Sequence, residues 1–348
     1  MNKIIYLFIL LFTIAGFAQK SVNSRALSRS QDSIQTFYNK LFKVVKNSYV
    51  YRKDVNWNDI ETTVKNNLGQ YQNFEGSLKE VTTLLNFIKA DHSKVFYNKA
   101  FYTGDFPAPS KEDFSDQWLK KFRAKPEFEV KVLDSNIGYI LMPGIITQDL
   151  SAENIHNISQ AMYDEIYKIK SSGNIEGWII DLRFNTGGNC EPMLLALYDF
   201  LGDNTIWGII NQNKKKVSSI KLLNGTYYTD SYKMSYVDKR GQLMDNAKVA
   251  VITNFATGSS GEVTTLAFKG RKNTAFIGEK TNGKTTSNMV INLPYGAYII
   301  LSTGLDCDRN GNFYTHITPD ITVYKKDNFE NLLLDQNITE AIRFIRSE

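Results

Sequence analysis

Three segments of the sequence combine glycine turns with side chains that can take part in chemistry. They are residues 181–189 (DLRFNTGGN), 254–262 (NFATGSSGE) and 278–288 (GEKTNGKTTSN). Each follows a short apolar run typical of a buried strand, and open α/β sheets place their sites at the carboxyl ends of such strands. Each pattern alone is common, but their order and spacing together indicate one site.

The first segment ends in a double-glycine turn before a helix. Glycines let backbone N–H groups face a ligand, and a helix N-terminus favours negative charge. Gly187 and Gly188 are therefore candidates to hold an oxyanion, although the same residues are compatible with an ordinary strand-to-helix turn.

The second segment presents Ser259 and Ser260 at the start of a helix, where a hydroxyl can act as a nucleophile. The alternative is a capping box, because Glu262 lies three residues after Ser259. The GSSG spacing also differs from the GxSxG nucleophile elbow.

The third segment offers Lys284 and, four residues later, Asn288. A lysine in such a turn is usually a solvated surface charge. As a general base it would have to be neutral, and burial among apolar strands favours that form.

The elements that must position these residues change in character along the chain. Apolar residues recur at helical spacing up to about residue 90, and residues 101–130 are mixed and aromatic-rich. Short apolar strands then alternate with helices, which indicates parallel βαβ units. Strands are expected over 137–142, 177–182, 249–253 and 274–278, and helices over 30–46, 58–68, 76–88, 155–169, 192–201, 260–268 and 335–345. Polar, Tyr-rich residues 205–245 interrupt this alternation, and we interpret them as an inserted hairpin region.

With these motifs in order, the chain resembles the C-terminal-processing (tail-specific) serine peptidases and their tricorn-type relatives. The resemblance covers roughly residues 30–345. Its motifs are a GYI strand at 138–140, DLRxNxGG at 181–188, a Ser-rich turn closed by Glu at 257–262, GExTxGK at 278–284 and PDI at 319–321.

The resemblance implies an α/β fold with a ClpP/crotonase-like core and an N-terminal helical domain. Together with the signal pattern of residues 1–18 described below, it divides the chain into 1–18 signal peptide, 19–100 helical domain, 101–135 connecting segment without a PDZ domain and 136–348 catalytic core with an insertion near 205–245.

The resemblance also implies the chemistry. The family's catalytic Ser and Lys are 25 residues apart, which assigns the nucleophile to Ser259 and the general base to Lys284. Amides of Gly187, Gly188 and Ser260 would hold the oxyanion. The substrate would be a peptide or unfolded protein, bound at an exposed strand edge, with no metal or organic cofactor.

Two departures from the family pattern bear on these roles. Only about 45 residues separate His92 from Gly138, too few for the PDZ domain that often precedes the core. Asn288 replaces the Gln that follows the lysine in the processing enzymes.

A further match leaves the base open. Asp91-His92-Ser93 resembles the DxHS motif of the tricorn-like branch, in which a histidine is the base. His92 is therefore the alternative to Lys284, unless it is a structural residue.

Residues 1–18 have the pattern of a secretory signal, with Lys3 before an apolar stretch too short to span a membrane and small residues at positions 16 and 18. We expect an exported protein, periplasmic or extracellular, without a stable membrane span once the signal is cleaved. In an oxidising compartment Cys190 and Cys307 would either pair or remain free.

Composition excludes other classes. A net charge of +5 without a long basic run argues against nucleic-acid binding, and two Cys and three His are too few for a Cys/His zinc module.

Three alternatives remain beside a peptidase: a catalytically silent peptide-binding relative, a penicillin-interacting enzyme using Ser218-x-x-Lys221, and a crotonase-like enzyme acting on acyl thioesters. The second lacks SDN and KTG companion motifs, and nothing indicates nucleotide binding for the third.

Overall fold

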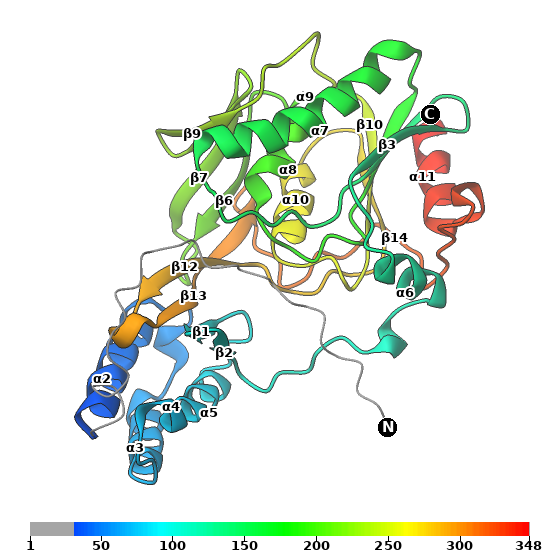
Figure 1. Ribbon diagram of the computed structural model, residues 1–348. Helices are drawn as coiled ribbons and strands as arrows, with labels where there is room; N and C mark the ends of the chain where they lie inside the picture. The colour runs from blue at the N-terminus through cyan, green and yellow to red at the C-terminus, as the bar shows by residue number, and fades with distance from the viewer. Residues whose placement is uncertain (1–30, 348) are drawn as a thin grey trace.

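The computed structural model describes residues 31–347, which form a small helical lobe and a larger α/β lobe joined by one long strand (Figure 1). The expected signal at 1–18 lies outside the described residues. Between residues 31 and 347 no helix is both long enough and apolar enough to cross a bilayer. Cys190 and Cys307 are both free thiols.

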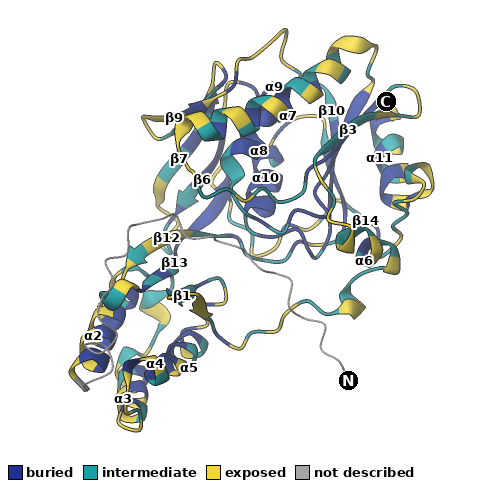
Figure 2. Cartoon of the chain, in the orientation of Figure 1, coloured by how far each residue is buried: buried dark blue, intermediate teal, exposed yellow. Residues whose placement is uncertain are grey.

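The helical lobe is built from amphipathic helices whose apolar faces meet in one core (Figure 2). Its elements are α2 (Gln31–Ser48), α3 (Trp57–Leu68), α4 (Phe74–Ser77), α5 (Lys79–Phe87), β1 (Lys94–Tyr97) and β2 (Ala100–Tyr102). The helix expected over 76–88 is divided at Leu78, because Asn73 caps a separate short turn by accepting from the Gly76 N–H at 2.8 Å.

The larger lobe contains a six-stranded sheet in the order β14-β11-β10-β5-β4-β3. Its strands are β3 (Glu129–Leu133), β4 (Ile137–Leu141), β5 (Gly177–Asp181), β10 (Lys248–Thr253), β11 (Thr274–Gly278) and β14 (Ile321–Thr322). All neighbours are parallel except β3 with β4, so the expected βαβ arrangement is present. The sheet begins before the expected boundary at residue 136, because β3 pairs along the whole of β4.

Helices cover both faces of this sheet (Figures 1 and 2). The helices are α6 (Asp116–Arg123), α7 (Ala152–Ser172), α8 (Cys190–Ala196), α9 (Tyr198–Leu201), α10 (Ser260–Phe268) and α11 (Gln336–Arg346). Apolar residues of α7, α8 and α10 pack in one core with Ile140 and Ile180, whereas α6 and α11 pack with Tyr139 and Ile179 on the opposite face. Every residue of β4 and β5 is buried, as their apolar sequences predict.

A second sheet runs from one lobe into the other in the order β2-β1-β13-β6-β7-β8-β9, with β12 on β13. Its further strands are β6 (Thr205–Ile210), β7 (Lys216–Leu223), β8 (Thr226–Thr229), β9 (Tyr232–Tyr236), β12 (Thr286–Asn292) and β13 (Tyr298–Asp308). The region expected as an inserted hairpin, 205–245, thus supplies the meander β6–β9. β13 pairs with β1 over 298–300 and with β6 over 305–308, so this strand belongs to both lobes.

Candidate active site

Ser259 lies at a strained turn between β10 and α10. The Gly261 N–H donates to the Gly258 carbonyl at 2.9 Å, and Ser259 between them has φ 53° and ψ −118°. These are the angles of the first central residue of a type II′ turn, a position that favours glycine. A non-glycine residue held in such a conformation costs about 1–3 kcal/mol and often marks a functional position. The side chain remains partly exposed.

The double-glycine turn faces this serine. A Cβ built on Gly187 would lie 3.0 Å from the Ser259 Cβ, and one on Gly188 would lie 2.0 Å from the Ile145 carbonyl oxygen. With φ of 120° and 117°, both positions require glycine. The turn is held in place by the Ser260 hydroxyl, which donates to the Gly188 carbonyl at 2.5 Å.

The amides near Ser259 differ in how they are used. The Gly187 N–H donates to Asn185 Oδ1 at 3.2 Å. Within residues 31–347 the amides of Gly188 and Ser260 have no hydrogen-bond partner. These two N–H groups are therefore the ones available to an oxyanion beside Ser259.

Glu262 ties the serine turn to the lysine segment. Its Oε2 accepts from the Ser259 N–H at 3.0 Å and from the Lys284 N–H at 2.7 Å. Its Oε1 accepts from the Thr281 hydroxyl at 2.5 Å and the Gly283 N–H at 2.7 Å. Burial raises the pKa of Glu262 to about 7, although these four hydrogen bonds act in the opposite direction. Glu262 is thus the helix cap expected from the sequence and also a clamp on the lysine segment.

The turn between α5 and β1 brings Asp91 of the helical lobe to Lys284 and His92 to β12. The Lys284 Nζ donates to the Asp91 carboxylate at 2.5 Å and to the Asp91 carbonyl at 3.1 Å. The ammonium group expected to lose its proton is thus held in an ion pair. His92, next to Asp91, turns instead toward β12.

His92 is held by hydroxyl and amide groups. Its Nδ1 lies 2.8 Å from Thr286 Oγ1, and the Asn288 amide nitrogen lies 3.3 Å from Nδ1 and 3.2 Å from Nε2. Burial, reinforced by the charge of Lys284, lowers the pKa of His92 to about 4. The imidazole is therefore neutral at physiological pH.

The structure thus gathers most of the residues predicted from the sequence. Glu262 joins the turns of Ser259 and Lys284. Asn288, on the strand that follows Lys284, contacts His92. Within the described residues no hydrogen bond joins Ser259 Oγ to His92 or to Lys284.

Two residues that sequence reasoning missed are Thr286 and Ser302. Ser302, on β13, contacts both Thr286 and Asn288 through its hydroxyl. Thr286 lies two residues from Lys284, but Ser302 carries no local sequence signal, because only the pairing of β12 with β13 places it there.

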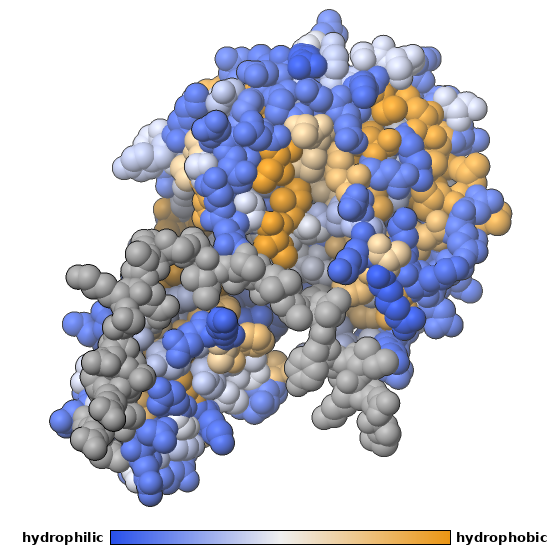
Figure 3. All heavy atoms as spheres, viewed as in Figure 1, coloured by the Kyte–Doolittle hydropathy of each residue, from blue (hydrophilic) through white to orange (hydrophobic). Residues whose placement is uncertain are grey.

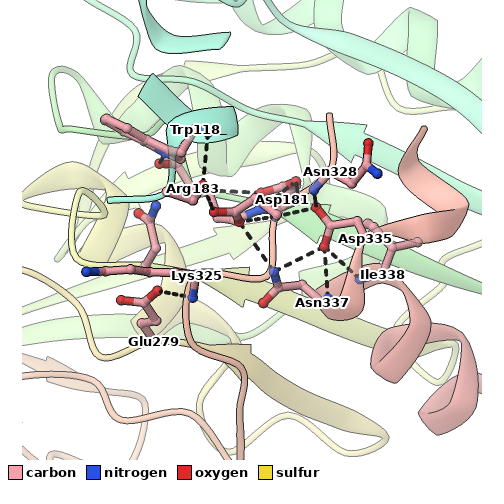
Figure 4. A network of polar contacts seen from close by, with 12 residues as sticks. Trp118, Asp181, Arg183, Glu279, Lys325, Asn328, Asp335, Asn337 and Ile338 are labelled. Carbon is pink, nitrogen blue, oxygen red and sulfur yellow. Dashed lines mark hydrogen bonds and ion pairs between the residues drawn. The ribbon is translucent and has the colours of Figure 1, made fainter. Parts of the chain in front are cut away.

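Asp181 and Arg183, at the start of the first segment, have a structural role (Figure 4). Arg183 is fully buried and forms ion pairs with Asp181 at 2.6 Å, Asp327 at 2.6 Å and Asp335 at 2.7 Å. The Trp118 Nε1–H donates to the Arg183 carbonyl at 2.9 Å. This network fixes the end of β5, and hence the start of the glycine turn, against α6 and α11.

Comparison with known proteins adds sequence relatives. The model of Peptidase family S41 matches residues 136–323, more than half of the chain. The nisin-resistance protein of Lactococcus lactis subsp. lactis is 29% identical over 212 residues, 60% of this chain and 62% of that protein. A carboxy-terminal-processing protease of Bartonella bacilliformis is 23% identical over 193 residues, 55% of this chain and 39% of that protein. Both matches span less than two thirds of the relative's length.

Solved structures share the fold. A lipoprotein from Streptococcus agalactiae superposes with a TM-score of 0.63 at 22% identity, over 89% of this chain and 95% of that one. The photosystem II D1 C-terminal processing protease superposes with a TM-score of 0.54 at 12% identity, over 88% and 97%.

Proposed function

The chain belongs to peptidase family S41, and on that premise we propose that it is a serine peptidase that hydrolyses peptide bonds through an acyl-enzyme on Ser259. The observation that carries the proposal is the strained turn that presents Ser259 beside two unpaired amides, those of Gly188 and Ser260. A nucleophile beside a pre-organised oxyanion site is the arrangement that acyl transfer requires.

We assign the general base to His92 in preference to Lys284. A general base needs a free lone pair, and the Lys284 ammonium, paired with the Asp91 carboxylate, has none. His92 is neutral, because burial lowers its pKa to about 4. Lys284 then acts as a fixed positive charge that ties the helical lobe to the core.

The reaction follows from these roles. Ser259 Oγ attacks the scissile carbonyl carbon as its proton passes to His92 Nε2, and the amides of Gly188 and Ser260 bind the oxyanion. The imidazolium gives its proton to the leaving amine, which departs and leaves an ester on Ser259. A water molecule, deprotonated by the same imidazole, then releases the acyl product.

The free edge of β12 supports a peptide or unfolded protein as substrate. β13 covers one side of β12, and within the described residues no strand covers the other. β12 begins two residues after Lys284 and exposes Met289 and Val290, at 57% and 65% of their surfaces. A substrate added as a further strand there would pass the site, with apolar side chains beside it.

The opposite side of the site has apolar surface as well. Ile146, which follows β4, is 46% exposed, and its neighbour Ile145 accepts a hydrogen bond from the Asn189 N–H at 2.7 Å, directly after the glycine turn. Figure 3 shows hydrophobic residues gathered on the drawn face of the larger lobe, with hydrophilic residues around them. This surface favours substrates with apolar residues near the cleaved bond.

Hydrolysis of casein by the purified protein tests the proposal. We expect Ser259→Ala and His92→Ala to lower the rate by about 10³-fold or more, and Lys284→Met to keep it within about tenfold of wild type. Activity that survives in Ser259→Ala would contradict the assignment of the nucleophile.

A Ser–Lys dyad is the second candidate, and one observation favours it. The amides of Ser259 and Lys284 bond the same oxygen of Glu262, so the two residues are tied to one point. Loss of activity in Lys284→Met with activity kept in His92→Ala would select this mechanism.

A silent peptide-binding relative is the third candidate, because Ser259 Oγ has no hydrogen bond to either base within residues 31–347. Catalytic hydrogen bonds are often long before substrate binds, so this geometry agrees with an active enzyme too. Failure of Ser259 to react with a fluorophosphonate probe would select the silent relative.

Export completes the proposal. The proposal that the protein is exported depends on the signal pattern of residues 1–18. Cell fractionation of the full chain and of a chain lacking residues 2–18 tests it, and equal retention of both in the cytoplasm would contradict it.

A further inference from the structure

A chain of hydroxyl groups runs behind His92 and connects both lobes. His92 Nδ1 lies 2.8 Å from Thr286 Oγ1, and Thr286 Oγ1 lies 3.0 Å from Ser302 Oγ. The Ser302 hydroxyl in turn contacts Asn288 Oδ1 at 2.9 Å. Ser302 is almost completely buried, and its N–H donates to Ser93 Oγ at 3.1 Å, which fixes its position against β1.

Asn288, at the end of this hydrogen-bond chain, determines which partner each hydroxyl group donates to. An amide oxygen only accepts, so the Ser302 hydroxyl must donate to Asn288 Oδ1. Ser302 then has no proton left for Thr286, and the Thr286 hydroxyl must donate to Ser302 Oγ. Thr286 Oγ1 is therefore an acceptor for the ring, and His92 Nδ1 must carry the proton.

The Asn288 amide nitrogen leaves the other ring nitrogen accessible. It is almost equally far from Nδ1, at 3.3 Å, and from Nε2, at 3.2 Å. An atom in the ring plane at those two distances would collide with Cε1 between them. The amide therefore lies over the ring face, and the in-plane lone pair of Nε2 remains available.

The neighbouring carboxylate does not orient the ring. The Asp91 carboxylate pairs with Lys284 Nζ at 2.5 Å, and His92 Nδ1 is bonded to Thr286 instead. In a Ser-His-Asp triad a carboxylate orients the histidine ring. Here two neutral hydroxyl groups and an amide occupy that position.

We propose that Thr286, Ser302 and Asn288 are positioning residues that hold His92 as the Nδ1–H tautomer, with Nε2 unprotonated and ready to accept the Ser259 proton. The catalytic consequence depends on the proposed function, in which His92 is the general base. The tautomer itself depends only on the hydrogen-bond chain.

Nitrogen NMR of the full protein labelled with ¹⁵N-histidine tests the tautomer directly. The chain has three histidines, and the His92 signals are those absent from His92→Gln. We expect His92 at neutral pH to show a protonated Nδ1 and an unprotonated Nε2. A protonated Nε2 in the wild-type protein would overturn the proposal.

Substitutions in the hydrogen-bond chain test whether that chain sets the tautomer of His92. Thr286→Val keeps the shape and removes the hydroxyl, so the Nδ1–H preference should be lost, while Thr286→Ser should restore it. Asn288→Asp keeps an acceptor and should preserve the tautomer, whereas Asn288→Leu should release it. Thr62→Val, on the surface of α3, is the matched control. An unchanged tautomer in both folded Thr286→Val and folded Asn288→Leu would also overturn the proposal.

Kinetics separate the positioning role from a merely structural one. Thr286→Val should lower kcat by about 10- to 100-fold with little change in KM, and Thr286→Ser should recover most of the rate. Equal loss in Thr286→Val and Thr286→Ser would contradict the catalytic role. If the tautomer is as proposed but His92→Ala stays active, the proposed function fails while the hydrogen-bond chain stands.

Discussion

At the residue scale the most informative feature is the backbone of Ser259. Its φ of 53° and ψ of −118° place a serine where a type II′ turn favours glycine. The sequence around it, TGSSGE, predicted a helix cap and a candidate nucleophile, and both descriptions fit the same residue. The strain itself could not be predicted, because it arises from the way the glycine turn and Glu262 hold the residue.

Ser259→Gly tests that strain. Glycine adopts this conformation without a Cβ penalty, so we expect the variant to be more stable than Ser259→Ala by about 1 kcal/mol. Both variants should be inactive. Urea unfolding measures the difference, and equal midpoints would show that the turn carries no strain.

The charge state of His92 makes a second prediction. In the proposed mechanism, reaction of Ser259 with a fluorophosphonate requires neutral His92. Because burial lowers the pKa of His92 to about 4, acidification from neutrality leaves the imidazole unprotonated until the pH approaches that value. We expect any change in the labelling rate near pH 7 to come from Glu262, whose pKa burial raises to about 7, and the loss due to His92 to come only as the pH approaches about 4. A rate that continues to climb well above neutral pH would indicate a lysine base instead.

At the scale of elements, the strand ends were predictable and the strand partners were not. Apolar runs predicted β5, β10 and β11 to within a residue or two, and α10 at its observed bounds. Nothing in local periodicity predicted that β1 pairs with β13 some 200 residues later. A register shift between Ser287 and Asn288 sets Asn288 opposite Ser302, so the support of His92 depends on a bulge that the sequence does not reveal.

The glycine turn after β5 makes the prediction at this scale. A Cβ on Gly188 would lie 2.0 Å from the Ile145 carbonyl oxygen, so Gly188→Ala must displace the turn that carries one of the two amides proposed to bind the oxyanion. We expect a rate loss of about 10²-fold or more, together with destabilisation. Gly173→Ala is the control, because nothing lies within 4 Å of its added Cβ and its φ is extended. Wild-type activity in Gly188→Ala would contradict the assigned site.

At the scale of the whole molecule the family match confirms the resemblance that the motif order predicted. The α/β fold with a helical N-terminal region was predicted as well. The structural role of the DLR motif was not predicted, because two of the three ion-pair partners of Arg183, Asp327 and Asp335, lie about 150 residues away in the sequence.

Arg183→Met tests whether this network holds the molecule together. Removing the guanidinium leaves buried carboxylates of three chain segments without their partner, so we expect a loss of about 3–5 kcal/mol in the free energy of unfolding. Arg343→Met is the control: its ion pair with Glu340 is on the surface and should be worth less than about 1 kcal/mol. Similar stability of the two variants would contradict the network's role.

The two lobes meet at the site itself, where Asp91 and His92 come from the helical lobe and Ser259 and Lys284 from the α/β lobe.

The central claim is that His92, and not Lys284, activates Ser259. The most direct measurement is the rate at which a fluorophosphonate labels Ser259 in the wild type, His92→Ala and Lys284→Met, with the labelled residue identified by mass spectrometry. The account predicts labelling at Ser259 that falls by about 10³-fold in His92→Ala and stays within about tenfold in Lys284→Met. Undiminished labelling in His92→Ala, with labelling lost in Lys284→Met, would contradict it.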